Sequence, residues 1–385
     1  MRTAVISDLH LGSSGGEDLL HDAAIRDLLW REIKGCDRVI LLGDAVELRD
    51  RPIAEALELA RPFFTELGGV VGDGGVVLVP GNHDHRFAEP LLDQVALSEE
   101  GTLGLEQRTG ARDGAIGKIS DWLGHTELEV AYPGLWLRND VYAMHGHYMD
   151  CHLTLPRAEC LAANVLMRIS DRPPDPAEPM DYERVLRPLY GLIFGLAQSG
   201  GAVAGSAARA SERAWRYTRS AGGGTPSGGR LAKLGAAATA RAAVPAAVWA
   251  LNRALRSDLT ADLSPASITR GALAAATETV RRLGIGADHV IVGHTHRGGP
   301  RETDDPWRLS NGNQLHNTGN WVFTRVLHRP GTRPGPYWPG TVTWVDDEGA
   351  PRRVRLLDDH RPEDLGAIAR GGRFTLAALA SEQTG

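Results

Sequence analysis

The sequence predicts an α/β protein in which short buried strands alternate with helices. Five short apolar runs rich in Val, Ile and Leu end in turn residues, which is the pattern of a buried strand that leads into a loop. Apolar residues at helical spacing lie between the early runs, and further strands follow late in the chain. Helices that alternate with strands in this way favour layers of helices packed on a sheet.

Each of the five apolar runs is followed by side chains that can bind a metal ion. In order they are TAVISDLHLG with Asp8 and His10, RVILLGD with Asp44, VVLVPGNHD with Asn82, His83 and Asp84, VYAMHGH with His145 and His147, and IVGHTHRG with His294 and His296. In α/β proteins functional groups gather in loops beyond the carboxyl ends of the strands, so we expect these loops to meet. Residues two apart in an extended chain point to the same side, so each pair of that spacing can reach one ion.

Taken singly, each motif has another interpretation. Asp8 can cap a following helix, Asp44 and Asn82 can be turn residues, and an HxH pair can lie on a solvated strand. Five such units in one chain favour a shared site for divalent ions. No cysteine takes part in any of the five.

The five motifs resemble, in type and order, those of the calcineurin-like metallophosphoesterase family. That family has DxH, GDxx(D/E), GNH(D/E), a histidine before glycine, and GHTH; this sequence has DLH, GDAVE, GNHD, MHGH and GHTH. The resemblance covers about residues 1 to 150 and 285 to 350. It implies a four-layer α/β/β/α sandwich of two mixed sheets flanked by helices, and an enzyme that hydrolyses a phosphate monoester, diester or pyrophosphate ester.

The resemblance also implies two divalent metal ions, with Mn²⁺ expected first and Fe, Zn, Ni or Mg as alternatives. It assigns Asp8, His10 and His296 to one ion, Asn82, His145 and His294 to the other, and Asp44 to a bridge between them. Two ions about 3.5 to 4 Å apart need a shared anionic ligand. Together they neutralise the charge of a phosphate ester and generate hydroxide at neutral pH.

In the family, the histidine at the position of His83 donates a proton to the leaving group or steadies the phosphoryl oxygens, and the carboxylate at Asp84 orients it. Imidazole suits that role because it titrates near neutral pH. His147 is left open: it lies either behind the ligands or towards solvent.

Turn and periodicity signals place the main elements. We expect a helix over Asp18 to Lys34, a second that opens at Pro52 and ends before Gly68, and a third over Ser264 to Leu283. The segments LHNTGNWVFT and GTVTWVDDEGAPRRVRLL read as strands, the latter a hairpin that turns at Asp346 to Gly349. The resemblance implies that the NTGNW loop, Asn317 to Trp321, borders the site.

The predicted core comprises residues 1–150 and 285–355. Residues 151–284 form a helical, basic insertion whose last helix rejoins the core, and 356–385 form a C-terminal tail. The insertion resembles the helical lid of UDP-2,3-diacylglucosamine hydrolases, which act on a lipid-bearing pyrophosphate. That branch has arginine where this chain has His83, so lipid-linked and nucleotide substrates both stay open.

The insertion differs from the rest of the chain in charge. Between Gly205 and Ser257 there are nine basic residues and one acid, in a chain of net charge −6. Arg209, Arg213 and Arg216 fall on one helical face, which can meet an anionic membrane surface or simply face water; nucleic acid is not favoured. The run Pro188 to Ala208 is uncharged but weakly hydrophobic, which favours an apolar lid helix over a membrane span.

Other features bound the location and the class. The three cysteines form no CxxC pair, and the first strand starts at Arg2 or Thr3, which leaves no room for a signal peptide. Both features predict a cytoplasmic protein, and a peripheral association with the membrane stays open. GGGTPSGG lacks the GK(S/T) of a nucleotide-binding loop, and GDAVELRD lacks the arginine of protein Ser/Thr phosphatases. The alternative is a non-catalytic, membrane-associated scaffold on the same fold. Such scaffolds usually lose metal ligands, whereas this sequence has a suitable residue at every ligand position.

Overall fold

The computed structural model describes residues 1–15, 17–71, 74–99, 101–110, 113–154, 158–170, 172–199, 252–253, 259–260, 262, 265–301, 304–310, 312–328 and 334–371. These residues fall into two compact units. Unit 1 takes the described residues of Met1–His147, Tyr190–Ala204 and Ile285–Gly385, and unit 2 takes those of Tyr148–Leu189 and Gly205–Gly284. The predicted α/β class is confirmed.

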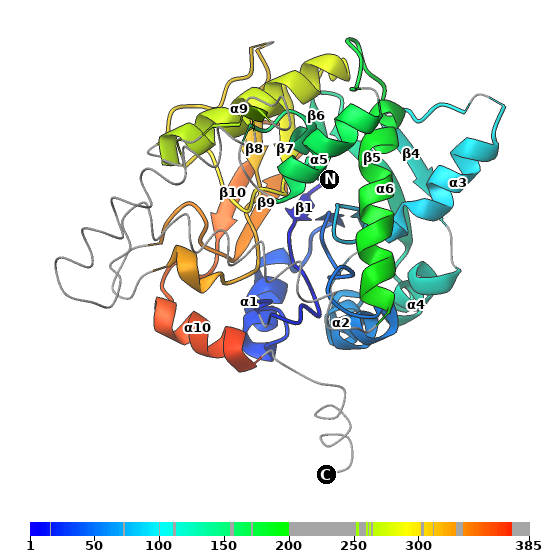
Figure 1. Ribbon diagram of the computed structural model, residues 1–385. Coiled ribbons are helices and arrows are strands. Elements are labelled where there is room, and N and C mark those ends of the chain that lie inside the picture. Colours follow the sequence, from blue (N-terminus) through cyan, green and yellow to red (C-terminus); the bar gives the residue numbers. More distant parts are fainter. Residues whose placement is uncertain are drawn as a thin grey trace, which may run out of the picture. The chain divides into compact units, whose positions relative to one another are not determined.

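Unit 1 is built on a mixed sheet of ten strands (Figure 1). The strands are β1 Thr3–Ile6, β2 Arg38–Leu42, β3 Val76–Val79, β4 Glu106–Thr109, β5 Leu128–Arg138, β6 Val141–Met144, β7 His289–Val292, β8 Gln314–Asn317, β9 Thr341–Val345 and β10 Arg352–Arg355. Their order is β10-β9-β1-β2-β3-β5-β6-β7-β8, and β4 pairs with β5 beside this path. All five strands predicted to precede a ligand loop are present.

Strand β5 divides the sheet into two halves. Its start pairs in parallel with β3, and from Gly134 onwards it pairs antiparallel with β6. The first half therefore comprises β1 to β4, β9 and β10, and the second half comprises β6, β7 and β8. A Cβ at Gly134 would lie 2.4 Å from the Ala143 carbonyl oxygen, so only glycine lets the strand pass this closely. The two predicted mixed sheets are thus two halves joined through one long strand.

Alternating strand residues build two apolar layers. Val5 and Ile40 of the first half share one buried cluster with Ala143 and Ile291 of the second, so the two halves pack against each other. Ile6 points to the opposite face and joins the cluster that contains the helices. Burying one such aliphatic side chain contributes about 1.5 to 3 kcal/mol to the stability of the fold. Both layers therefore hold the strands in place, and with them the loops at the strand ends.

The helices of unit 1 are α1 Ala23–Ile33, α2 Ile53–Leu67, α3 Glu89–Leu97, α4 Gly114–Leu123 and α10 Pro362–Gly371. Helix α2 confirms the prediction of a helix between Pro52 and Gly68. The predicted start of α1 at Asp18 was wrong. The Asp18 carboxylate accepts from the Leu20 amide (2.6 Å), which forms a turn, and Asp22 caps the helix through the Ala24 amide (2.9 Å).

Predictions for the later elements hold in part. The hairpin is confirmed, with Trp344 of β9 opposite Arg352 of β10. Helix α9, Pro265–Arg282, confirms the third predicted helix. The strand expected over LHNTGNWVFT ends at Asn317, because the Asn317 side chain accepts from the Gly319 amide (2.9 Å) and turns the chain. In the predicted C-terminal tail, Leu365 of α10 is fully buried in the core.

Unit 2 contains α5 Ala158–Ile169, the first part of α6 Pro179–Gln198, and α9. The Tyr148 hydroxyl donates to Glu183 (2.6 Å), and the Tyr148 and Tyr182 rings stack with centroids 4.8 Å apart. The division between the units falls within α6, at Tyr190.

The predicted basic stripe of Arg209, Arg213 and Arg216 lies outside the described residues. The uncharged run is described as far as Ser199, within and just after α6, where Leu192 is 62% exposed and Leu196 39%. None of the helices in the described part of the chain is both long and apolar enough to cross a membrane.

Candidate metal centre

The loops that carry the predicted ligands are held to one another by their backbones. Strands β1, β2 and β3 are parallel neighbours, as are β6 and β7, so within each half the ligand loops leave the same edge. The His10 amide donates to the Asp44 carbonyl (2.8 Å), and the Gly293 amide donates to the His145 carbonyl (3.0 Å). Backbone hydrogen bonds therefore link the ligand loops that follow neighbouring strands.

Backbone strain concentrates at the same residues. Apart from glycines, the described residues with a clearly positive φ are Asp8, His10, Asp44, His294 and His296, with values between 47° and 63°. A positive φ costs a residue with a side chain about 1 to 3 kcal/mol, and residues strained in this way cluster at functional sites. All five are predicted metal ligands.

Glycines make room for the ligands of neighbouring loops. A Cβ at Gly43 would lie 2.2 Å from the His145 ring, and one at Gly293 would lie 2.5 Å from Asp8 Oδ2. The glycines of the GD and GHTH motifs are thus required because another loop's ligand occupies the space of a side chain.

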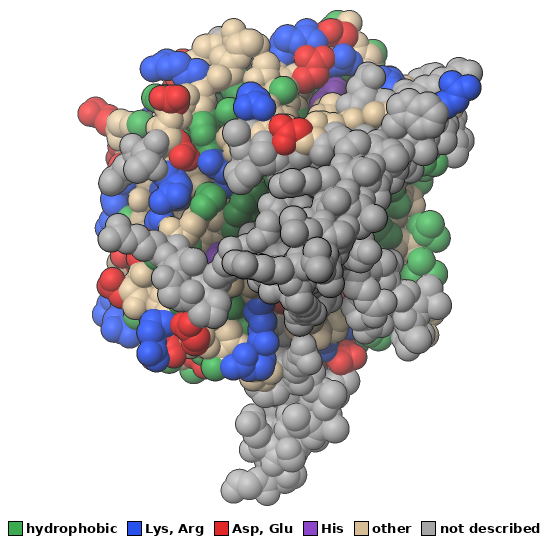
Figure 2. All heavy atoms as spheres, turned by 60° about the vertical axis from the view of Figure 1, so that its left-hand side comes forward, with side chains coloured by type: hydrophobic (Ala, Val, Ile, Leu, Met, Phe, Trp, Pro, Cys, Tyr) green, Lys and Arg blue, Asp and Glu red, His purple; other side chains and the backbone are tan. Residues whose placement is uncertain are grey.

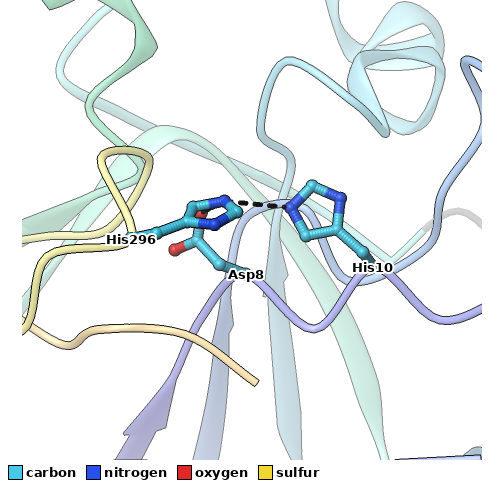
Figure 3. A group of neighbouring side chains, drawn as sticks. All are labelled: Asp8, His10 and His296. Atoms are coloured by element: carbon cyan, nitrogen blue, oxygen red, sulfur yellow. Dashed lines mark hydrogen bonds and ion pairs between the residues drawn. The ribbon is translucent and has the colours of Figure 1, made fainter. Parts of the chain in front are cut away.

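Asp8, His10 and His296 converge at the end of β1 (Figure 3). His296 Nε2 lies 3.2 Å from His10 Nε2 and 3.2 Å from Asp8 Oδ1. Asp8 Oδ2 accepts from the Ser7 hydroxyl and the His294 amide (3.1 Å), whereas the buried Oδ1 faces the His296 ring. Two imidazole nitrogens and a carboxylate oxygen that face one point form a ligand set for a cation.

A second group is centred on Asp44. His145 Nε2 lies 3.2 Å from Asp44 Oδ2 and 3.2 Å from Asn82 Oδ1, and His294 Nδ1 lies 3.1 Å from the same Asn82 oxygen. Asp44 Oδ2 is also 3.8 Å from His10 Nε2, which belongs to the first group. One carboxylate oxygen therefore lies between the two sets of predicted ligands.

His83 lies at the edge of both groups, and its orientation is set by Glu47. Glu47 Oε2 is 2.6 Å from His83 Nδ1 and 2.9 Å from His10 Nδ1. The His83 amide donates to Asp44 Oδ1 (2.8 Å), and the side chain stays 25% exposed, whereas Glu47 is buried. Sequence reasoning missed Glu47 as a site residue. The acid at the end of GDAVE, three residues after Asp44, was the available signal.

Asp84 does not make the contact with His83 that was expected of it. Its carboxylate accepts from the backbone amides of Gly81 (2.6 Å) and Ala45 (2.7 Å), and among the described contacts it makes none with the His83 ring. Asp84 therefore fixes the loops after β2 and β3 to each other, and the carboxylate that contacts the His83 ring is that of Glu47.

His147 lies behind the ligands, so the solvent-facing alternative is wrong. It is 2% exposed, its Nε2 is 3.1 Å from the Tyr132 hydroxyl, and its ring centroid is 5.7 Å from that of His145. Burial and the neighbouring His145 hold the pKa of His147 well below its usual range, so the ring is neutral at pH 7.

The ionisable side chains of the centre strongly affect one another's pKa values. Burial opposes ionisation of Asp44, but the His145 and His83 imidazoles hold its pKa well below the usual range. Burial also opposes protonation of His10, yet the hydrogen bond to Glu47 and the charge of Asp44 raise its pKa to about 10. The pKa of His145 is raised to about 9, against burial, chiefly by Asp44. The buried carboxylates thus draw positive charge into the site.

The donors fit divalent ions. Within each of three overlapping groups the candidate atoms all lie within 4.8 Å of one another: Asp8, His10 and His296; His10, Asp44 and His83; and Asp44, His145 and His294. An ion about 2.0 to 2.2 Å from each ligand places its ligands no more than about 4.4 Å apart, close to these spacings. Nitrogen and oxygen donors without sulfur suit ions such as Mn²⁺, Fe²⁺ and Zn²⁺.

The family model of the calcineurin-like phosphoesterases matches residues 1–183. The N-terminal part of this chain is therefore similar to the calcineurin-like phosphoesterases. The match includes four of the five ligand loops, and the fold brings the fifth, at residues 293–296, to the same place. The family in general hydrolyses phosphate esters and binds divalent metal ions. A search of curated proteins finds no match to this chain.

Residues Asn317 to Trp321 border the candidate centre, as the sequence predicted. The Asn320 side chain donates to the His296 carbonyl (2.8 Å), and the Trp321 amide donates to the Asp8 carbonyl (3.0 Å). This loop ties the first and last ligand loops together, although they are nearly 300 residues apart in sequence.

Proposed function

We propose that the protein is a dinuclear metal-dependent phosphoesterase. One ion would be held by Asp8, His10 and His296, the other by Asn82, His145 and His294, and Asp44 would bridge them. The observation that carries this proposal is the position of Asp44 Oδ2, 3.2 Å from His145 and 3.8 Å from His10. When bound, the two ions supply charge neutralisation of the phosphate and hydroxide near neutral pH.

The remaining residues would act on protons and geometry. His83 is partly exposed at the edge of the ligand groups, so its imidazole can donate a proton to the leaving oxygen. Glu47 holds that imidazole through Nδ1, which leaves Nε2 to face the substrate. Asp84 keeps the loops that carry Asp44 and Asn82 in register through their backbone amides.

Metal content tests the proposal most directly. Purified protein loaded with Mn²⁺ should hold two ions per chain, and chelation should abolish hydrolysis of bis(p-nitrophenyl) phosphate and p-nitrophenyl phosphate until Mn²⁺ is restored. A full complement of ions without hydrolysis of either ester would favour the non-catalytic scaffold.

Proton release provides a second test that does not depend on activity. Without metal, the raised pKa values of His10 (about 10) and His145 (about 9) mean that both rings carry a proton at pH 7.5. A metal ligand must be neutral, so binding expels these protons and affinity rises with pH up to about those values. Calorimetry in two buffers of different ionisation enthalpy should show a net release of about two protons.

We further propose that the basic insertion brings the enzyme to anionic surfaces, as a lipid-linked substrate would require. The support is the charge of Arg209, Arg213 and Arg216 and the exposure of Leu192 and Leu196 on α6. Replacing the three arginines with glutamate should weaken binding to anionic vesicles by roughly 3 kcal/mol, at about 1 kcal/mol per basic residue. If wild-type protein does not bind such vesicles, a soluble nucleotide or sugar phosphate becomes the preferred substrate.

A further inference from the structure

Four arginines gather beside the loop that follows the last metal ligand. Figure 2 shows one face of the molecule, on which basic and acidic side chains are interspersed. A local excess of positive charge is therefore identified from the contacts of individual residues. The excess lies around residues 297–301 and on the edge strand β10. We name this group the arginine cluster; its members are Arg297, Arg301, Arg353 and Arg355.

The guanidinium groups of the cluster act on one another. The pKa of Arg353 is lowered to about 10, first by its burial and then by the positive charges of its neighbours, Arg355 above all. Arg353 and Arg355 are two apart on β10 and so share one face of the strand, whereas Arg352, which precedes Arg353, is exposed and belongs to the other face. Like charges held this close favour the binding of an anion.

Three of the four arginines are held in place. Arg297 pairs with Asp304 (3.3 Å) and its guanidinium lies over the Trp307 ring, 4.6 Å from the centroid. Arg353 donates to the Pro300 carbonyl (3.0 Å). Arg355, in turn, pairs with Asp358 (2.9 Å).

Donors remain after these contacts. Nη1 of Arg297 is buried and has no hydrogen-bond acceptor among the described residues. The Arg301 side chain makes neither a hydrogen bond nor an ion pair with any residue that the structure describes. Among the described residues, the ion pairs of the four guanidinium groups involve two carboxylates, those of Asp304 and Asp358.

The cluster adjoins the metal centre through the backbone. A Cβ built on Gly298 would lie 3.8 Å from the central carbon of the Arg353 guanidinium. Gly298 follows His296 by two residues, so their Cα atoms are at most about 7 Å apart. Two phosphate groups separated by a few bonds can therefore reach His296 and Arg353 together.

We propose that the arginine cluster binds a second phosphate group carried by the substrate. This inference rests on the proposed function, in which the first phosphate group is hydrolysed at the metal centre. Guanidinium groups present planar pairs of N–H donors that match phosphate oxygens, which explains why the cluster uses arginine alone. The substrate is then a phosphoanhydride, with the two phosphates joined by one oxygen, or a bisphosphate, with the phosphates on separate carbons.

The kinetic test compares three full-length proteins loaded with Mn²⁺: wild type, the double variant Arg301→Gln with Arg355→Gln, and the control Arg352→Gln. Substrates are bis(p-nitrophenyl) phosphate, adenosine 5′-diphosphate and adenosine 3′,5′-bisphosphate; for a nucleotide that is not hydrolysed, inhibition of the first substrate is measured. The double variant should raise KM or Ki for one nucleotide by at least about tenfold, since charge-assisted hydrogen bonds are lost. The nucleotide affected distinguishes a phosphoanhydride from a bisphosphate.

Turnover of bis(p-nitrophenyl) phosphate, which has one phosphate, should stay within about twofold in all three proteins, because neither substituted arginine touches the metal centre. That result also shows that the double variant folds. Unchanged KM and Ki for both nucleotides would overturn the inference and leave the proposed function intact.

A binding measurement separates the two proposals. Calorimetric titration of metal-free protein with inorganic pyrophosphate should show binding by wild type and Arg352→Gln, and at least about tenfold weaker binding by the double variant. If no ester is hydrolysed but this difference is found, the proposed function fails and the anion site stands. Equal binding by all three proteins refutes the site.

Discussion

The two halves of the sheet contribute different chemistry to the candidate centre. The first half supplies all of its described carboxylates, from Asp8, Asp44, Glu47 and Asp84, together with His10, Asn82 and His83. The second half supplies imidazoles alone, from His145, His147, His294 and His296. Negative charge is therefore fixed on one side of the centre, and the other side completes the ligand sets with neutral donors.

This difference indicates what each half does. Buried carboxylates need cations, which in the metal-free chain are the protons on His10 and His145. Bound metal ions replace those protons. Substitutions in the first half should therefore remove metal ions or catalysis, while a single substitution in the second half should loosen one ion.

The largest effect is expected for Asp44→Asn, which keeps the shape of the side chain but removes the charge between the ligand groups. Both ions should be weakened, and kcat/KM for bis(p-nitrophenyl) phosphate should fall about 10³-fold or more, because several kcal/mol of charge stabilisation are lost. The matched variant in the second half, His294→Asn, should lose about one ion. Metal analysis would refute the bridging assignment if Asp44→Asn retained two ions.

Removal of His83 should separate catalysis from metal binding within the first half. His83→Ala should keep two ions but lower kcat about 10²-fold or more, since a positioned proton donor contributes roughly 10²- to 10⁴-fold. The loss should shrink for p-nitrophenyl esters compared with alkyl esters, because a good leaving group needs no proton. An equal loss for both would instead assign His83 to stabilising the phosphoryl oxygens.

A smaller effect is expected at Glu47, whose single oxygen holds both His10 and His83. Glu47→Gln should lower kcat/KM by about 10- to 100-fold, the usual range for residues that orient metal ligands. Glu58→Gln, on the exposed surface of α2, serves as the control. A Glu47 variant with the wild-type rate would show that His83 needs no orienting group.

That the candidate ligands lie close together could be predicted from the sequence, because each of them lies in a motif at the end of an apolar strand. The start of α1 could not, since the Asp18 carboxylate makes a turn instead of a cap, and both uses of aspartate precede helices. Strand β5 was missed because its pattern is interrupted at Pro133 and Gly134, where it leaves one half of the sheet for the other.

The contact between Glu47 and His83 could be seen only in the fold. Sequence neighbours suggested that Asp84 holds His83, but a side chain points away from that of the next residue, and Asp84 turns towards the backbone amides of Gly81 and Ala45. Likewise, the arginine cluster joins residues 297–301 to β10, whose pairing with β9 places it beside that loop. Such contacts depend on register between strands and cannot be read from motif spacing.

The smallest effect concerns histidines of the second half that lie outside the ligand set. His289 Nδ1 of β7 and His316 Nε2 of β8 are 3.0 Å apart. Burial, followed by the charges of His289 and Arg353, lowers the pKa of His316 to about 4, and burial lowers the pKa of His289 as well. The His316 ring is therefore neutral in the folded protein at pH 5, where the unfolded chain protonates it.

A histidine with a lowered folded-state pKa contributes stability that is lost as pH falls from its unfolded value of about 6.5 towards its folded value. For His316 the free energy of unfolding should drop by about 2 kcal/mol between pH 7 and pH 5. His10 and His145 have raised pKa values and act in the opposite direction, so the wild-type curve alone cannot isolate this contribution. The difference between wild type and His316→Asn in urea titrations at both pH values cancels the common groups. The variant should lose less stability than wild type on acidification, whereas parallel losses would mean that His316 is protonated without cost in the folded protein.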